Sequence, residues 1–288
     1  MCISIGESKM TSTHLYVGEA EKNGKTVHIL AYQNTAESSG PNAMILPFPT
    51  QVKMTQDNII DTSSFKNFLK NISDASKRIE YTKSARRGFT LGVAAAGMDS
   101  FAEVFSVGSY TVVLADHVAQ IPEALKRVPE NRRPAVSNSF LIGFGQLYPK
   151  QPVALCCWNG SIEAEPLLWW YEPKNPGTLF VPTMDAHDGN PPKLYKPVYT
   201  DHIISVGAVG PTKGNKVNYS NKIPDEVMDL LPTHVFGGKL PYQIPNGDVF
   251  VKTAALHDGD KFTSPNWFRG HGDNFTNDGI LNGWTVRN

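Results

Sequence analysis

The feature that most restricts the fold is a pair of β-strand patterns joined by a tight turn. The segments HLYVGEA (14–20) and KTVHILAYQN (25–34) flank EKNGK, whose centre is Asn23-Gly24. A type I′ hairpin turn needs positive φ at both central residues, and Asn-Gly is the dipeptide that adopts it most readily. The first third of the chain is therefore predicted to form antiparallel sheet.

Strand patterns recur along the rest of the chain, and a few helical patterns separate them. The predicted strands are NAMILPFP, FAEVFSVGSYTVVLAD in two parts about Gly108-Ser109, PVALCCW and SIEAEPLLWWYEP about Asn159-Gly160, GTLFVP, HIISVGAV and DVFVKTAAL. The predicted helices are 63–79 with a serine N-cap, IPEALKRV capped by Asp116, SNSFLIGFGQLY and PDEVMDLL. Strands and helices do not alternate regularly, so the prediction is an α+β fold: strand-rich, mainly antiparallel or mixed sheet, with a few packed helices.

The chain is expected to form one globular domain over residues 1–288. No internal repeat, heptad pattern or linker composition divides it, and large strand-rich domains reach about this length. The last stretch, residues 265–288, is rich in Gly, Asn and Asp and is predicted to be an irregular tail.

Composition excludes several classes of protein. Lys and Arg number 27 and Asp and Glu number 27, so the basic surplus of a nucleic-acid binder is missing. No apolar run approaches the ~20 residues that cross a bilayer, and the start of the chain lacks the pattern of a signal peptide. Three cysteines do not make a disulfide framework, which favours a reducing, cytoplasmic location. We therefore expect no nucleic-acid or membrane partner, and nothing in the sequence indicates the number of subunits.

Known catalytic motifs are missing, and the first positive candidate is the cysteine of the opening MCISIG. The sequence has no phosphate-binding loop, dinucleotide fingerprint, Gly-x-Ser-x-Gly elbow, His-Glu-x-x-His or Cys-x-x-Cys. Removal of Met1 would leave Cys2 with a thiol and a free α-amine, whose pKa near ~7.7–8.0 suits a general base. The alternative is that Cys2 is a small, half-buried strand residue without a catalytic role.

An initial Met-Cys followed by antiparallel sheet is similar to the start of class II amidotransferases and bile-salt-hydrolase-like amidases. The resemblance covers residues 1–6 and the coarse strand order, and it implies a hydrolase with an N-terminal nucleophile. Those families place an arginine early in the chain, whereas the first arginine here is Arg78.

An acyl-transfer site also needs hydrogen-bond donors for the oxyanion. The asparagine side chains near predicted strand ends are Asn34, Asn42 and Asn159. Asn159 is included with Cys2 among the candidate catalytic residues, although its predicted hairpin turn explains it equally well.

Histidine and aspartate recur together in loops. The pairs are Asp116-His117, Asp185 with His187-Asp188, Asp201-His202, His257 with Asp258 and Asp260, and His271 with Asp273. Together these side chains suit Zn, Mn or Fe, but turns have the same composition, and we predict neither a metal nor another cofactor. The long irregular segment FVPTMDAHDGNPP is the favoured functional loop, so Asp185, His187 and Asp188 are candidate ligand-binding residues.

Two further features have a structural and a functional interpretation. In LLWWYEP, strand alternation places Trp169 and Tyr171 on one face and Trp170 on the other, so Trp170 is a candidate ligand contact. The adjacent Cys156 and Cys157 are expected to be buried and structural.

These observations lead to one hypothesis with two alternatives. The hypothesis is a cytosolic hydrolase of amide-type bonds that uses Cys2 as nucleophile on a small-molecule or peptide substrate. The alternatives are a binding or assembly protein without a catalytic site and a metal-dependent hydrolase that uses the His/Asp loops.

Overall fold

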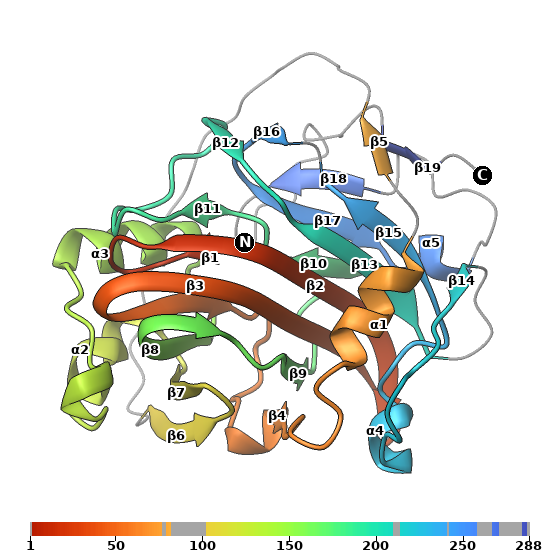
Figure 1. The fold of residues 1–288 in the computed structure, drawn as a ribbon, viewed down its shortest axis with the longest axis horizontal. Helices are drawn as coiled ribbons and strands as arrows, with labels where there is room; N and C mark the ends of the chain where they lie inside the picture. Colours follow the sequence, from red (N-terminus) through yellow and green to blue (C-terminus); the bar gives the residue numbers. More distant parts are fainter. Residues whose placement is uncertain are drawn as a thin grey trace.

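The structure is a computed structural model that describes residues 2–76, 79–81, 102–209, 214–240, 242–257, 267–270 and 284–286. Strands make up 45% of the structure and helices 17%, which confirms the predicted strand-rich α+β fold. Figure 1 shows the strands gathered in the centre of the molecule, with helices at its margins.

The strands, in chain order, are β1 (Cys2–Ile3), β2 (Lys9–Lys22), β3 (Lys25–Pro47), β4 (Ile59–Ile60), β5 (Ile79–Tyr81), β6 (Glu103–Val107), β7 (Tyr110–Ala115), β8 (Val153–Glu163), β9 (Leu167–Tyr171), β10 (Thr178–Val181), β11 (Asp185–Ala186), β12 (Pro197–Tyr199), β13 (Ile203–Ala208), β14 (Asn215–Lys216), β15 (His234–Lys239), β16 (Gln243–Pro245), β17 (Asp248–Lys252), β18 (Trp267–Gly270) and β19 (Trp284–Val286). The α-helices are α1 (Phe68–Ala75), α2 (Ile121–Leu125), α3 (Asn138–Leu147), α4 (Asp225–Met228) and α5 (Ala254–His257). Short 3-10 helices cover Gln56–Asn58, Val118–Gln120 and Glu130–Arg132.

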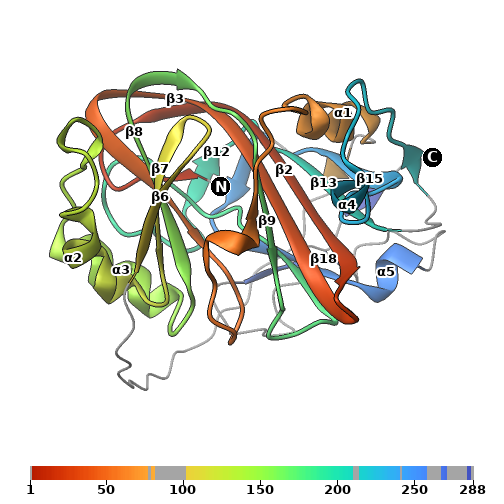
Figure 2. The same cartoon turned by 90° about the horizontal axis from the view of Figure 1, so that it is seen from below.

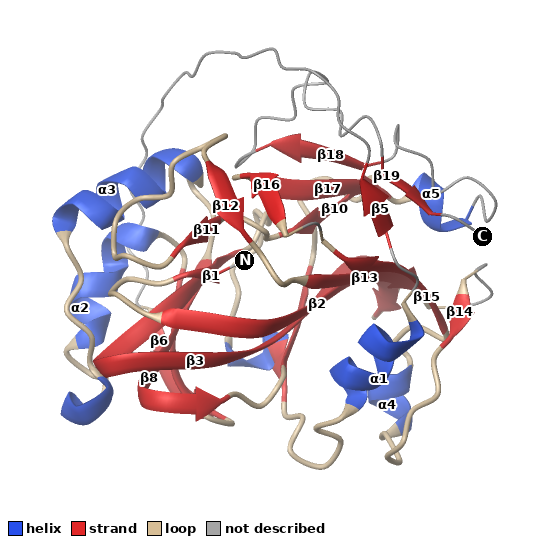
Figure 3. Ribbon diagram, turned by 45° about the horizontal axis from the view of Figure 1, so that its top comes forward, coloured by secondary structure: helices blue, strands red, loops and turns tan. Residues whose placement is uncertain are grey.

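One large mixed sheet organises the fold. Its strand order is β14-β15-β13-β2-β3-β8-β7-β6, and β9 pairs with both β3 and β4. The pairing of β13 with β2 is parallel, whereas the neighbouring pairs in this sheet are antiparallel. A second, antiparallel sheet has the order β10-β17-β18. In Figure 3 this smaller sheet lies along one side of β2 and β13, and helices α1 and α4 lie on the other.

Both faces of the central strands are buried because their side chains alternate between two cores. On β2, Leu15 and Val17 belong to the larger core, which extends to β10, β17, α2 and α3. Tyr16 and Ala20 belong to a smaller core beneath α1 and α4. Figure 2 shows these two pairs of helices at opposite ends of the sheet. This double coverage explains why the central strands are apolar on both faces.

The Asn23-Gly24 hairpin is confirmed. Asn23 has φ 54° and Gly24 has φ 74°, and Lys22 pairs directly with Lys25. The second strand continues further than its sequence pattern indicates, because NAMILP is the end of β3 and not a separate strand. Irregular pairing with β8 between Glu37 and Pro41 marks the place where the pattern is interrupted.

The predicted hairpin at Asn159-Gly160 is wrong. Both residues lie inside the continuous strand β8, where Asn159 pairs with Pro41 and Gly160 has φ 68°. β3 pairs with β8 on both sides of the dipeptide, at Asn159 and at Ser161, whereas β7 pairs only with Val153–Cys157. Pairing with β3 therefore carries the strand past a dipeptide that favours turns.

The sequence patterns predict where the helices lie better than they predict the residues at which the helices begin. The predicted helix SNSFLIGFGQLY is confirmed as α3, and Ser137 Oγ caps it by accepting a hydrogen bond from the backbone N–H of Phe140 at 3.1 Å. Helix α1, by contrast, begins at Phe68 with Asn67 and not a serine at its N-cap. Before α2, the cap is formed by His117, whose Nδ1 accepts from the Ala119 N–H, and not by Asp116.

The strand patterns about Gly108-Ser109 are confirmed as β6 and β7, and GTLFVP, HIISVGAV and the start of DVFVKTAAL as β10, β13 and β17. Within the predicted tail, β18 pairs with β17, and β19 pairs with β5. The rest of residues 265–288 lies outside the described residues.

Candidate active site at the N-terminus

The N-terminal strand pairs with a segment from the middle of the chain. β1 runs parallel to β11, with Cys2 opposite Asp185 and Ile3 opposite Ala186. Two further backbone bonds of 2.9 Å continue this contact, from Ser4 N–H to the Ala186 carbonyl and from Ser8 N–H to the His187 carbonyl. Figure 1 shows β1 and β11 side by side near the N-terminus. The pairing thus brings the candidate nucleophile next to the loop that the sequence marks as functional.

Apolar burial and one asparagine hold the N-terminal segment in place. Ile3 and Ile5 are buried in the larger core. Ile5 N–H donates to the Ala43 carbonyl of β3 at 2.9 Å. The side chain of Asn42 accepts from Gly6 N–H at 3.0 Å and donates to the Glu7 carbonyl at 2.9 Å. Asn42, considered from the sequence as an oxyanion donor, therefore serves to hold the backbone of residues 6 and 7.

Next to Cys2, Asp185 and His187 form a close pair. Asp185 Oδ1 lies 2.8 Å from His187 Nε2, and the side chains are 8% and 31% exposed respectively. They are two residues apart beside β1, and the His187 side chain is partly accessible.

Asn246 fixes the backbone of Asp185 from the other side. Its Oδ1 accepts from the Asp185 N–H at 2.8 Å, and its Nδ2 donates to the Asp185 carbonyl at 2.7 Å. Asn246 is itself 2% exposed. Because both backbone groups of Asp185 are satisfied by one buried side chain, the position of the Asp185–His187 pair is set by a residue 61 positions away.

Beneath this loop lies a buried carboxyl group, Asp248, which is 0% exposed. Its Oδ1 accepts from the backbone N–H groups of Thr183 and Met184 at 3.0 and 3.1 Å, and its Oδ2 accepts from the Tyr148 hydroxyl at 2.6 Å. Burial raises the pKa of Asp248 to about 6, although the three donors oppose the shift by favouring the charged form. Burial and the nearby carboxyl group raise the pKa of the Tyr148 hydroxyl well above its ordinary value.

The third candidate of the loop, Asp188, closes a turn at its exposed end. Its Oδ1 accepts from the Asn190 N–H at 3.1 Å, and hydrogen bonding by the Asn190 side chain is the main cause that lowers the pKa of Asp188. Glu7 pairs with Asp188 through an isolated bridge, so this residue lies near the N-terminal segment.

Two other predicted site residues lie elsewhere in the fold. Asn159 is exposed on β8, and β3 lies between it and the N-terminal segment. Trp170 is half-buried on β9, where its Nε1 donates to the Asp57 carbonyl at 2.9 Å and Lys22 Nζ lies 5.2 Å from the ring centroid. The predicted alternation of LLWWY is confirmed, since Trp169 and Tyr171 are buried in the larger core and Trp170 packs against the smaller one.

The structure brings together one of the His/Asp pairs named from the sequence. Asp185 and His187 meet, whereas His117 forms a helix cap and Asp201 accepts from the Ser12 N–H. Among the described residues, no three His, Cys, Asp or Glu side chains are placed to bind one metal ion. The pairs around residues 257–260 and 271–273 lie outside the part of the chain whose side chains are described.

Cys156 and Cys157 are free and buried, as expected. Burial raises the pKa of Cys156 well above its ordinary value, and it raises that of Cys157 to about 12. Thiols in this state are poor nucleophiles, so neither competes with Cys2.

Sequence reasoning did not identify Asn246, Asp248 and Tyr148. Asn246-Gly247-Asp248 has the composition of an ordinary turn, and Tyr148 follows a predicted helix. Only the tertiary contacts show that these residues support the loop beside Cys2.

Comparison with protein-family models, with curated proteins and with solved structures finds no match for this chain. In the part of the chain that the structure describes, no helix has the length and apolar character needed to cross a membrane.

Proposed function

We propose that the protein hydrolyses amide-type bonds, with Cys2 as the nucleophile after removal of Met1. The observation that carries this proposal is the parallel pairing of β1 with β11, which sets the backbone of Cys2 opposite Asp185 in the loop that also holds His187. A reactive cysteine, a free α-amine and an oriented imidazole are the groups that acyl transfer requires.

In the proposed reaction, the α-amine of Cys2 removes the thiol proton and Sγ attacks the carbonyl carbon. The C–N bond then breaks, the amine product leaves with the proton, and a thioester to Cys2 remains. Water hydrolyses the thioester, releases the carboxylic acid and restores the thiol. His187, which lies beside Asp185 and is partly accessible, is proposed to contact the substrate next to the reacting carbonyl.

The proposed location is the cytosol. Cys156 and Cys157 are free thiols within the described residues, which is typical of proteins in a reducing compartment. The proposed substrate is a small molecule or a peptide and not a nucleic acid, in line with the balance of 27 basic and 27 acidic residues.

The first test is intact-mass measurement combined with iodoacetamide alkylation of the folded protein from pH 5 to 9. We expect Met1 to be absent and Cys2 to be alkylated with a midpoint well below the ~8.5 of a free cysteine. Cys156 and Cys157 are an internal control, because both should remain unmodified until the protein unfolds. Retained Met1, or a Cys2 that reacts only after unfolding, would contradict the proposal.

The second test is a panel of N-acyl aminocoumarin amides with the wild type, Cys2→Ser and Cys2→Ala. Removal of an essential nucleophile should lower turnover by roughly 10³-fold or more while the circular dichroism spectrum is retained. Turnover that persists in Cys2→Ala would instead favour another mechanism, and its loss on chelation would favour a metal-dependent hydrolase.

A non-catalytic binding function is the second candidate, and a different observation favours it. Tyr199, the last residue of β12, and Tyr242, just before β16, are 62% and 75% exposed, with ring centroids 5.0 Å apart. Paired aromatic rings on a surface are suited to contact a partner. Binding through these rings should be unaffected by Cys2→Ala and lost in the double substitution of both tyrosines by serine.

A further inference from the structure

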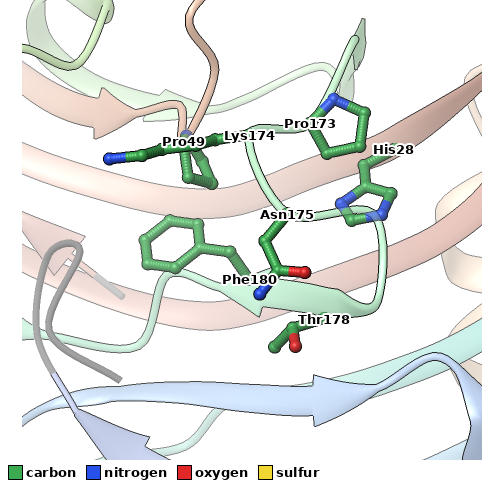
Figure 4. Close-up of a pocket in the computed structure, with 7 residues that line it drawn as sticks. All are labelled: His28, Pro49, Pro173, Lys174, Asn175, Thr178 and Phe180. Carbon is green, nitrogen blue, oxygen red and sulfur yellow. The ribbon is translucent and has the colours of Figure 1, made fainter. Parts of the chain in front are cut away.

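A small hollow on another part of the molecule contains a buried histidine with one unused ring nitrogen. Figure 4 shows the hollow, which is bounded by the end of β3, the loop after β9 and the start of β10. It is lined by seven residues: His28, Pro49, Pro173, Lys174, Asn175, Thr178 and Phe180. The ring of Phe180 also contacts that of Tyr148, at 6.4 Å between centroids, so one wall of the hollow borders the residue that donates to Asp248.

The tautomer of His28 follows from its one hydrogen bond. Nε2 lies 3.3 Å from the Pro176 carbonyl oxygen, which can only accept, so Nε2 carries the proton. Nδ1 is then a lone-pair acceptor, and it has no hydrogen-bond partner among the described residues. The side chain is 1% exposed, so bulk water does not compensate for the missing bond.

His28 is held in this state by its surroundings. Burial lowers its pKa to about 4, so the ring is neutral at pH 7. Tyr171, its cross-strand neighbour, packs against the ring edge-on at 5.8 Å between centroids. A buried acceptor without a partner is destabilising, and a ligand that donates to Nδ1 would recover the lost free energy.

The other walls define the rest of the ligand. Asn175 Oδ1 already accepts from the Gly177 N–H at 3.1 Å, so its NH₂ group is the part that can donate to a ligand. In Figure 4, Asn175 lies between His28 on one side and Phe180 and Pro49 on the other. The side chains of the prolines and of Phe180 form no hydrogen bonds and suit methyl or methylene groups.

We propose that this hollow binds a small neutral molecule or side group that carries an N–H or O–H donor beside an acceptor, of which a primary carboxamide is the simplest form. The carboxamide N–H donates to Nδ1 of His28, its oxygen accepts from the NH₂ of Asn175, and its alkyl group lies against Pro49 and Phe180. A carboxylate lacks the donor, so it is excluded at neutral pH.

The test is a titration of ¹⁵N-histidine-labelled protein with acetamide at pH 7, followed by NMR. We expect a saturable upfield shift of the His28 Nδ1 resonance, because a lone-pair nitrogen moves upfield when it accepts a hydrogen bond. Sodium acetate should cause no such shift. His117, whose Nδ1 already accepts from Ala119, is an internal control that should not respond to either compound.

Two variants test the proposed contacts through saturation-transfer measurement of acetamide binding. His28→Phe keeps the ring and removes both nitrogens, and Asn175→Asp keeps the acceptor for Gly177 and removes the NH₂ donor. Each should weaken binding at least tenfold. Asn175→Asp changes an exposed side chain, so it remains informative if His28→Phe disturbs folding.

Three results would overturn the proposal: no saturable shift with acetamide, an equal shift with acetate, or unchanged acetamide binding in Asn175→Asp. A His28 Nδ1 resonance that is already at its hydrogen-bonded position and does not move with acetamide would mean that the hollow holds only an ordered water.

Discussion

Replacement of the buried Asp248 by asparagine should change how the stability of the protein depends on pH. The folded-state pKa of Asp248 is about 6, against an ordinary value of 3.8. Because burial raises this pKa, the stabilisation that the group contributes is fully present below pH ~3.8 and is lost as the pH rises through 6. A difference of about 2 pH units at 1.36 kcal/mol each corresponds to about 3 kcal/mol of unfolding free energy.

Asparagine is a close isostere at this position. Its Oδ1 can still accept from the N–H groups of Thr183 and Met184, and its Nδ2 takes the place of Oδ2 and donates to the Tyr148 hydroxyl oxygen. Asp248→Asn should therefore fold, and it has no charge to desolvate at high pH.

The assay is urea unfolding of wild type and Asp248→Asn at pH 4, 5, 6, 7 and 8. The difference in unfolding free energy, variant minus wild type, should rise by about 2 kcal/mol from pH 4 to pH 8, mostly between pH 4 and 6, because part of the full change lies below pH 4. Other titrating groups are common to both proteins and cancel in the difference. Tyr148→Phe removes one donor to the Asp248 carboxylate. The pH range over which the unfolding free energy falls should therefore be higher in that variant than in the wild type. A difference that does not depend on pH, or that falls as pH rises, would refute the reasoning.

Two further substitutions test the backbone around the site and the sheet. Asn246→Ala removes both hydrogen bonds to the backbone of Asp185 and should lower the unfolding free energy by about 2–4 kcal/mol, as measured by chemical denaturation; a loss below ~1 kcal/mol would show that solvent replaces the lost bonds. Gly237→Ala should prevent folding or destabilise the protein severely, because Gly237 has φ 133° and an added Cβ would lie 2.0 Å from the Ile204 carbonyl oxygen. Gly40→Ala is the matched control, since a Cβ there meets no atom within 4 Å and should leave the melting temperature nearly unchanged.

Local signals in the sequence predicted the elements whose geometry depends on a few neighbouring residues. The Asn23-Gly24 turn forms because its two residues tolerate positive φ, whatever surrounds them. The hairpin of β6 with β7 depends in the same way on adjacent residues. Strand alternation placed Trp169 and Trp170 correctly on opposite faces, because the period of two is a property of any extended chain.

Where local conformational preference and tertiary packing disagree, strand pairing determined the structure. Asn159-Gly160 would turn in isolation, but β3 pairs with β8 on both sides of the dipeptide and carries the strand past it. The long strand β3 likewise continues through Pro41 to Pro47, so one strand covers two segments that the sequence pattern predicts as separate strands.

The chemical identity of the candidate site was determined by the sequence, and its assembly by the structure. Cys2, Asp185 and His187 are recognisable as reactive or ligand-binding types from their side chains alone. Their proximity depends on the pairing of residue 2 with residue 185 and on Asn246, which are contacts between distant positions that no local pattern encodes. Side-chain chemistry is a property of single residues, whereas proximity is a property of the folded chain, because it follows from how the whole core packs.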